Sequence, residues 1–356
     1  MKILFTHAKC GNGHTMAAKA LYDALAKDKT YAAEMIDLLD ESAAHRRVFE
    51  EGYRWVVTKA PWLWKLMYDI SDQDHAHETG LFFLAYLFPK FYRRLLDEQP
   101  DVVVATHFWT AAAAARLKKA GRLKGHVITV ITDYNVHKSW MHEGTDLYVV
   151  ASAFTKAVLE KEYGVPSSKI RAWGIPLREA FYTTKHIPRG DRLRVLMFSS
   201  DFGMGPFREL VHALKDKCRL TVLCGRDEKL KSELKMHEWT DGLIVKGIVP
   251  DMWNLLAEAD LVVLKAGGLS VTESLVMRRP MVFMKAIYGQ ETENIKFVTD
   301  HGVGFWPKSV DGLKDLLLSC IDDQTKLDAV ATAYEALPRT NALNEFSAYI
   351  AKLPRA

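Results

Sequence analysis

Short apolar segments alternate with helical stretches along most of the chain, and this alternation is the feature that most restricts the fold. The first series of apolar segments covers residues 2–7, 31–37, 101–106, 126–132, 146–150 and 170–173. Helical periodicity lies between several of them, as with Met16, Ala20 and Ala24. Strands that alternate with helices form a parallel sheet covered on both faces. The sequence therefore predicts a doubly wound α/β domain over residues 1–180.

A second series of the same kind follows a polar stretch that contains Pro176, Pro188 and Gly190, which is typical of an interdomain linker. Its predicted strands are residues 193–199, 219–224, 243–246, 261–265, 281–284 and 303–306. Its helices are expected to start near Gly205, Arg226, Asp251, Ser270 and Gln290. The pattern predicts a second domain over 190–335, and a final helix (336–356, within a helical segment 324–353) that can pack back on the first domain. We expect two domains facing a cleft, with ligands at the carboxyl ends of the strands.

Composition excludes several classes of protein. The 356 residues are 49% hydrophobic and 26% charged, with a net charge of +4. This charge is too small to indicate nucleic acid as a partner, but it allows weak attraction to an anionic membrane. The four cysteines have no paired zinc spacing. The chain opens on a strand-like run rather than a signal peptide, and its longest apolar run, 81–88, is too short to span a bilayer. We expect a cytoplasmic or peripheral protein.

A glycine turn, Gly11-Asn12-Gly13-His14, follows the first strand and opens a helix. Glycines let the backbone turn tightly and approach a ligand, and a helix N-terminus offers free N–H groups. With an unperturbed pKa of ~6.5, His14 suits a general base, although it can also be a capping or cleft-lining residue. Asp37 keeps an NAD-binding interpretation open, but Met16 replaces the third glycine of the dinucleotide fingerprint.

A second glycine turn, Gly267-Gly268, follows the apolar strand that ends at Leu264 and Lys265. Backbone N–H groups and the positive end of the next helix favour a pyrophosphate there. Ser270 is expected to cap that helix and to reach a phosphate. Glu273, one turn further on, can bind ribose hydroxyls, or it can simply be an acid that the helix dipole favours.

Two further segments extend this candidate donor site. After the next strand come Gln290, Glu291 and Asn294, whose side chains can pair with sugar hydroxyls. The turn Phe202-Gly203-Met204-Gly205 opens the second domain. It either contacts the donor or acceptor or is a purely structural turn. No Asp-x-Asp motif stands near a strand end, which fits phosphate neutralisation without a metal ion.

At this point the motifs resemble a known family. The Gly11 to His14 turn, the segment from Thr132 to Trp140, Gly174-Ile175-Pro176, and the run from Lys265 to Asn294 look like those of monogalactosyldiacylglycerol synthases and bacterial processive diacylglycerol glucosyltransferases. The resemblance implies a GT-B fold, a UDP-sugar donor, inversion without a metal, and a membrane-lipid acceptor, most naturally diacylglycerol.

The resemblance also implies roles for individual residues. His14 takes the catalytic position, and Asp133 is a second candidate for base or orienter unless it only caps a helix before Asn135. His137 and Trp140 fall on the acceptor side. The implied donor set is Gly13, Gly203, Gly205, Lys265, Gly267, Gly268, Ser270, Glu273, Gln290, Glu291 and Asn294.

The insertion over residues 45–95 is rich in aromatic and basic side chains. Trp and Tyr favour the membrane interface, and Lys and Arg attract anionic lipid. We therefore expect a membrane contact on the inner face of the cell membrane, unless these aromatics form core or a dimer surface. The predicted contact residues are Trp55, Trp62, Trp64, Phe82 and Phe83. A transferase with another acceptor, a UDP-sugar epimerase and a nucleotide-sugar sensor remain alternatives.

Overall fold

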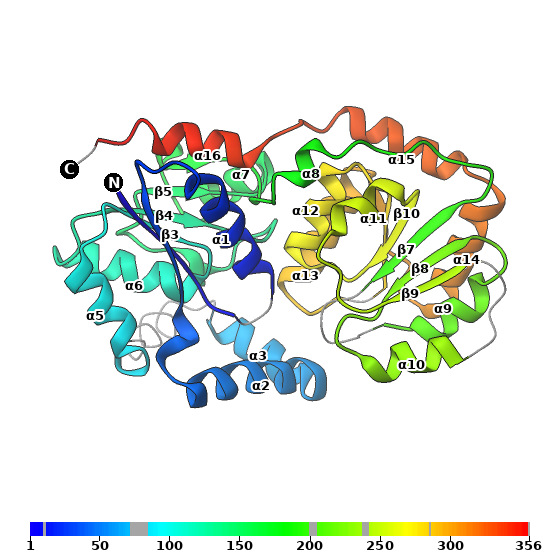
Figure 1. Cartoon of the computed structure of the whole chain (residues 1–356), viewed down its shortest axis with the longest axis horizontal. Coiled ribbons are helices and arrows are strands. Elements are labelled where there is room, and N and C mark those ends of the chain that lie inside the picture. Colours follow the sequence, from blue (N-terminus) through cyan, green and yellow to red (C-terminus); the bar gives the residue numbers. More distant parts are fainter. Residues whose placement is uncertain (10–11, 72–84, 199–204, 237–241, 285, 355–356) are drawn as a thin grey trace. The chain divides into compact units, whose positions relative to one another are not determined.

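The structure, a computed structural model, describes residues 1–356 except 10–11, 72–84, 199–204, 237–241, 285 and 355–356 (Figure 1). The chain forms two compact units. Unit 1 comprises Met1–Glu179, Tyr288–Gln290 and Thr340–Ala356, and unit 2 comprises Ala180–Ile287 and Glu291–Arg339. Each unit is built on one six-stranded parallel sheet.

The sheet of unit 1 has the order β2-β1-β3-β4-β5-β6. Its strands are β1 (Lys2–His7), β2 (Ala32–Asp37), β3 (Val102–Ala105), β4 (His126–Val130), β5 (Leu147–Val149) and β6 (Ile170–Arg171). Strand β2 lies on one side of β1 and the later strands lie on the other, so the winding direction reverses between β1 and β3. In open parallel sheets, ligands bind beyond the carboxyl ends of the strands at such a reversal.

The helices of unit 1 cover this sheet and extend from it. They are α1 (Asn12–Leu25), η1 (Leu38–Glu41), α2 (Ala43–Lys59), α3 (Pro61–Ser71), α5 (Pro89–Glu98), α6 (Phe108–Lys119), η2 (Lys138–Trp140), α7 (Ala153–Glu162), η3 (Ser167–Lys169) and α16 (Ala342–Ile350). The core beside β1 contains Leu4, Val103, Phe88 and Phe91.

The sheet of unit 2 has the order β12-β11-β10-β7-β8-β9, and its reversal lies between β7 and β10. Its strands are β7 (Arg194–Phe198), β8 (Arg219–Leu223), β9 (Leu243–Lys246), β10 (Leu261–Leu264), β11 (Met281–Phe283) and β12 (Gly304–Phe305). Its helices are α8 (Ala180–Thr183), α9 (Phe207–Leu214), α10 (Glu228–Met236), α11 (Met252–Glu258), α12 (Gly268–Val276), α13 (Gln290–Asp300), α14 (Val310–Asp322) and α15 (Thr325–Glu335).

Both sheets confirm the doubly wound α/β fold that the sequence predicts. Every predicted strand segment contains an observed strand. The central strands are predictable because a parallel strand buried on both faces consists of a short run of apolar residues. β3 and β10 illustrate this, since all four residues of each are buried.

The C-terminal part of the chain differs from the expected single helix over 324–353. It forms α15 and α16, with residues 337–341 between them in non-helical structure. Pro338 lies in this break, where a proline removes one backbone donor and disfavours a helical residue before it. α16 belongs to unit 1 and packs against α1. Its Tyr349 hydroxyl lies 3.0 Å from Nε2 of His126, and its ring lies 5.6 Å from that of Trp173.

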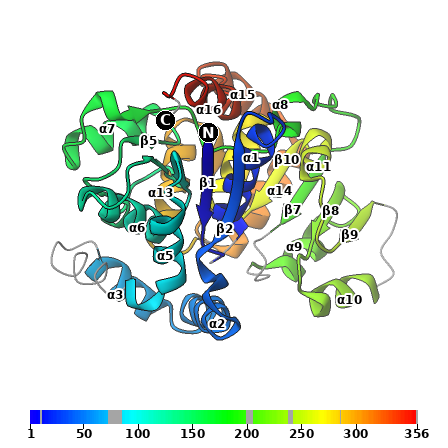
Figure 2. The same cartoon turned by 60° about the vertical axis from the view of Figure 1, so that its left-hand side comes forward.

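The insertion after β2 divides into a buried and an exposed part. Ser42 caps α2 by accepting a hydrogen bond from the backbone N–H of His45. Phe91 and Leu95 anchor α5 in the core of unit 1. In contrast, α3 has no buried residue although it is rich in apolar side chains. Figure 2 shows α2 and α3 at the end of unit 1 where β2 finishes.

Candidate functional site

Three neighbouring strands of unit 1 place His14, Thr106 and Thr132 together. His14 lies in the first turn of α1, which follows β1, while Thr106 follows β3 and Thr132 lies two residues beyond β4. Nδ1 of His14 is 2.8 Å from the carbonyl oxygen of Thr106 and 2.9 Å from Oγ1 of Thr132. The Thr106 hydroxyl also donates to the carbonyl oxygen of His14, at 2.8 Å. The histidine is therefore held through both its ring and its backbone.

The contact with the carbonyl oxygen of Thr106 indicates the tautomer of His14. A carbonyl oxygen only accepts hydrogen bonds, so Nδ1 must carry the hydrogen that points at Thr106. In the neutral ring, Nε2 then holds the free lone pair. Burial lowers the pKa of His14 to about 4. At this pKa the ring is neutral near pH 7, and Nε2 is able to accept a proton.

Two buried histidines, His7 and His107, lie near His14. The His107 ring meets that of His14 edge to face, with centroids 4.6 Å apart, and its Nδ1 accepts from the backbone N–H of Trp109. Nδ1 of His7 lies 3.1 Å from Oγ1 of Thr15. Burial lowers the pKa of both His7 and His107, and their mutual proximity to His14 disfavours a second positive charge.

The segment after β4 carries the predicted acceptor residues. Trp140 is buried, and its ring centroid lies 6.2 Å from that of His14. His137 caps η2, and its Nε2 lies 3.1 Å from the carbonyl oxygen of Tyr68 on α3. No helix starts at Asn135, so the alternative that Asp133 caps one there is wrong. Asp133 stays a predicted base or orienter, whereas Thr106 and Thr132 are the groups seen at Nδ1 of His14.

Asp37 has a structural role that accounts for its place after β2. Its carboxylate accepts from the backbone N–H of Leu39 at 3.0 Å and caps η1. It also accepts from the backbone N–H of Lys9, at 3.3 Å. The residue that kept an NAD-binding interpretation open thus serves the backbone around it.

In unit 2, the predicted diphosphate residues follow β10 at the reversal of the sheet. Gly267 is the N-cap of α12, with φ −67° and no side-chain cap, and Gly268 is its first helical residue. The expectation that Ser270 caps this helix is wrong, because the helix already begins two residues earlier. Ser270 is partly exposed within the first turn, and Glu273 is buried one turn further on.

Three of the predicted donor residues, Lys265, Glu291 and Asn294, make contacts inside unit 2 between the turn after β10 and α13. The buried Lys265 and Glu291 form an ion pair. The other carboxylate oxygen of Glu291 accepts from the backbone N–H of Ile287, at 2.7 Å. Nδ2 of Asn294 donates to the carbonyl oxygen of Ala266, at 2.9 Å. These contacts connect the turn after β10 to α13, with Glu291 and Asn294 bound to backbone groups and Lys265 bound to Glu291.

The other predicted donor residues are three glycines and Gln290, and the backbone settings of the described ones differ. Gly205 has φ +150°, and a Cβ there would lie 3.0 Å from Sδ of Met284 in the same unit, which favours glycine. Gly203 lies outside the described residues. Gly13 lies in the first turn of α1. Gln290 starts α13 and belongs to unit 1, as do Tyr288 and Gly289.

The predicted membrane residues divide into three groups. Trp55 and Trp62 are 57% and 70% exposed. Trp64 is partly buried, stacks edge to face on Tyr53, and donates from Nε1 to the carbonyl oxygen of Tyr288, at 3.2 Å. Phe82 and Phe83 lie outside the described residues. Other exposed apolar side chains of the insertion are Val48, Leu66, Met67, Ile70, Tyr86 and Leu87.

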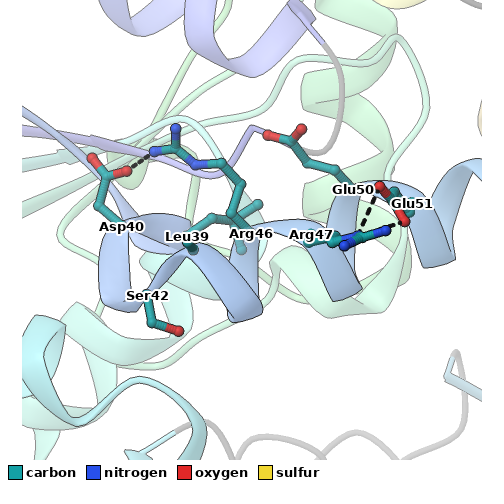
Figure 3. A pocket seen from close by; sticks show the side chains of 8 residues that line it. Leu39, Asp40, Ser42, Arg46, Arg47, Glu50 and Glu51 are labelled. Carbon is teal, nitrogen blue, oxygen red and sulfur yellow. Dashed lines mark hydrogen bonds and ion pairs between the residues drawn. The ribbon is translucent and has the colours of Figure 1, made fainter.

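Figure 3 shows a shallow pocket of about 480 Å³ at the start of α2. Arg46 pairs there with Asp40 and Arg47 with Glu51, while Glu50 adds a third carboxylate to the lining. None of the predicted site residues lines it.

Metal binding and membrane insertion depend on clusters of ligating side chains and on long apolar helices. The described residues contain no group of three or more His, Cys, Asp or Glu side chains suited to a metal ion. The reaction without a metal stays a prediction. Within the same residues, no helix combines the length and apolar character needed to cross a membrane.

The two doubly wound sheets define the GT-B class of α/β protein, and solved structures share this fold. MurG of Acinetobacter baumannii aligns over 99% of both chains, with a TM-score of 0.63 and 15% identity. A putative UDP-N-acetylglucosamine 2-epimerase from Listeria monocytogenes aligns over 98% of this chain and 95% of its own, with a TM-score of 0.61 and 17% identity. At these identities, the comparison shows the fold alone.

Sequence comparison is more specific. Residues 14–177 match the family model of monogalactosyldiacylglycerol (MGDG) synthase, which confirms the resemblance that the motifs predict. A processive diacylglycerol β-glucosyltransferase of Bacillus pumilus is 26% identical, over 94% of this chain and 91% of its own. Monogalactosyldiacylglycerol synthase 3 of Arabidopsis thaliana is 28% identical, over 86% of this chain and 71% of its own.

Proposed function

We propose that this protein is an inverting glycosyltransferase that moves a hexose from a UDP-sugar to a membrane lipid, namely diacylglycerol. The observation that carries the catalytic assignment is the 2.8 Å contact between Nδ1 of His14 and the carbonyl oxygen of Thr106, from which we assign the hydrogen to Nδ1 and the basic lone pair to Nε2. Relatives named for transfer to diacylglycerol support the acceptor and the reaction class.

In the proposed reaction, Nε2 of His14 takes the proton from the lipid hydroxyl as its oxygen attacks the anomeric carbon of the donor sugar. The bond from that carbon to the diphosphate breaks, UDP leaves with the bonding electrons, and the anomeric configuration inverts. General-base assistance of this kind contributes ~10²–10⁴-fold to a rate. Asp133 remains the second candidate in this role.

We assign the donor to the residues that follow β10 and β11. The N–H groups at Gly267-Gly268 and the positive end of α12 stabilise the leaving diphosphate without a metal ion. Glu273 binds the ribose, and Gln290 binds the hexose. Lys265, Glu291 and Asn294 support this site through the contacts that they make with the backbone and with one another.

In this proposal, the exposed apolar surface of α2 and α3 binds the membrane that contains the lipid acceptor. Trp64 and Tyr68 of α3 contact other parts of unit 1, but no residue of the helix is buried, and a bilayer interface would cover its exposed apolar side chains. Trp62, Leu66 and Ile70 recur every four residues and therefore share one face of α3. Diacylglycerol cannot leave the bilayer cheaply, since each CH₂ exposed to water costs ~0.8 kcal/mol. We therefore place the working protein on the inner surface of the cell membrane.

The test is UDP release from UDP-glucose and UDP-galactose, with and without anionic liposomes that contain diacylglycerol, followed by chromatography of the lipid product. We expect lipid-dependent release that His14→Ala lowers ~10²–10⁴-fold, and that the control His212→Ala, at an exposed histidine of α9, leaves unchanged. An altered sugar without an acceptor would indicate an epimerase. Donor binding with no turnover of any of these substrates would indicate a sensor.

A further inference from the structure

A threonine hydroxyl lies beside Nδ1 of His14, the ring nitrogen that does not take the proton in the proposed reaction. Oγ1 of Thr132 is 2.9 Å from Nδ1 of His14, and its side chain is almost completely buried. The carbonyl oxygen of Thr106 is the second group at the same nitrogen. Two neutral oxygen atoms therefore lie near Nδ1, and they belong to residues that follow the adjacent strands β3 and β4.

We infer that Thr132 is a positioning residue that fixes the His14 ring and stabilises the imidazolium formed when Nε2 takes the proton of the acceptor. The inference rests on the proposed role of His14 as the base. It assigns to a threonine the part that a carboxylate orienter plays beside many catalytic histidines.

The proton balance explains why the hydroxyl matters most during the reaction. Before transfer, the neutral His14 ring has one N–H, at Nδ1, which Thr106 alone can satisfy. After transfer, the ring is a cation with two N–H groups, and Nδ1–H becomes a stronger donor. The Thr132 hydroxyl can rotate so that an oxygen lone pair faces Nδ1. Because Thr132 is buried, bulk water does not replace that lone pair.

The surroundings of His14 make this assistance valuable. Burial lowers its pKa to about 4, and the nearby His7 and His107 offer no negative charge to an imidazolium. A hydrogen bond to a charged group stabilises more than one to a neutral group. The Thr132 hydroxyl thus stabilises the charged ring more than the neutral ring, so its removal is expected to lower kcat rather than weaken substrate binding.

The first experiment compares steady-state kinetics of Thr132→Val, Thr132→Ser and the control Thr129→Val on diacylglycerol liposomes. Thr129 is a buried threonine on β4 whose hydroxyl lies 3.1 Å from that of Thr145, so the control removes an equally buried hydroxyl away from His14. We expect Thr132→Val to lower kcat about tenfold, with KM for both substrates within about twofold. Thr132→Ser is expected to restore kcat, and Thr129→Val to leave it unchanged.

A double-variant cycle tests whether Thr132 acts through His14. In a His14→Ala background, Thr132→Val is expected to cause no further loss of kcat. Thermal unfolding of every variant separates folding from function, and Thr132→Ala replaces Thr132→Val if the valine variant does not fold.

The inference is overturned if Thr132→Val retains wild-type kcat while His14→Ala loses activity. It is also overturned if Thr132→Ser is as slow as Thr132→Val, or if Thr129→Val loses as much. Full activity of His14→Ala would instead refute the proposed base, and with it the proposed function of this site.

Discussion

Lys265 and Glu291 form a buried ion pair that joins the first residue after β10 to the second residue of α13. Glu291 additionally accepts from the backbone N–H of Ile287, which leads into α13. The sequence predicts both charged residues as contacts of the donor. In the structure they are each other's partners, so their first effect is on the stability of unit 2.

Removal of one partner from this pair is therefore expected to be costly. Lys265→Met leaves a buried carboxylate without its cation, which lowers the free energy of unfolding by ~3–5 kcal/mol. The double variant Lys265→Met/Glu291→Gln removes both charges and is expected to recover most of that loss. Urea unfolding measures all three proteins. The control is Lys314→Met, because Lys314 pairs with a largely exposed Asp311 and its loss should cost below ~1 kcal/mol. Equal losses in both lysine variants would contradict the prediction.

Two glycines of unit 2 are expected to respond differently to alanine. Gly205→Ala places a Cβ at φ +150° and 3.0 Å from Sδ of Met284, which should lower the free energy of unfolding by ~1–3 kcal/mol. Gly267 has φ −67°, and a Cβ there meets no atom within 4 Å. Gly267→Ala should therefore change stability by less than ~1 kcal/mol.

The same Gly267→Ala protein tests the proposed diphosphate site. If the backbone there must approach the ligand closely, the added methyl group should raise the Kd for UDP at least ~tenfold, or ~1.4 kcal/mol. Isothermal titration calorimetry measures the affinity. Gly190→Ala, at an exposed linker glycine with open space around it, is the control and should bind UDP as the wild type does. Unchanged UDP affinity in Gly267→Ala would argue against this site.

The buried histidines predict how stability depends on pH. Burial holds the pKa of His7, His14 and His107 below the unfolded value of ~6.5. As pH falls below ~6.5, the unfolded chain binds protons that the folded chain does not yet accept, so stability decreases toward the folded pKa values. Tm is therefore expected to fall between pH 7 and pH 5. His107→Asn keeps a capping side chain for α6 and should reduce this fall, whereas His212→Asn should not. An identical pH dependence in His107→Asn and wild type would contradict the assignment.

The exposed surface of α3 predicts membrane affinity. Trp62→Ser removes a 70% exposed indole from that surface and is expected to weaken sedimentation with anionic liposomes without a loss of Tm. Ile248→Ser changes a side chain that is 66% exposed in unit 2, and it serves as the control. We expect liposome binding of the control to match that of the wild type. Comparable weakening by both substitutions would indicate nonspecific adsorption rather than docking through α3.

Local patterns were sufficient to predict the strands and the positions of the glycine turns. The runs that form β1, β3 and β10 are apolar because both faces of a parallel sheet are covered, a property of a few consecutive residues. Local patterns did not predict where a helix begins or ends when several neighbouring residues are suited to that position. Ser270 has the chemistry of a helix cap, yet α12 begins at Gly268. Periodicity likewise suggested one C-terminal helix, while the chain around Pro338 forms two.

The aromatic insertion shows a second limit of the sequence. Its composition predicts an interface, but composition does not separate Phe88 and Phe91, which lie in the core, from Trp55 and Trp62, which are exposed. Burial depends on which face of each helix meets the sheet. Only the packing of α5 beside β1 decides that.

The sequence by itself determined the doubly wound fold, the turn that carries His14 and the glycine turn before α12, because each follows from residues that are close along the chain. The tertiary structure decided what orients His14. Thr106 and Thr132 are ordinary strand-end threonines in the sequence, 92 and 118 residues away from His14. They meet its ring because β1, β3 and β4 are adjacent in the sheet, and strand order is set by long-range packing rather than by any local pattern.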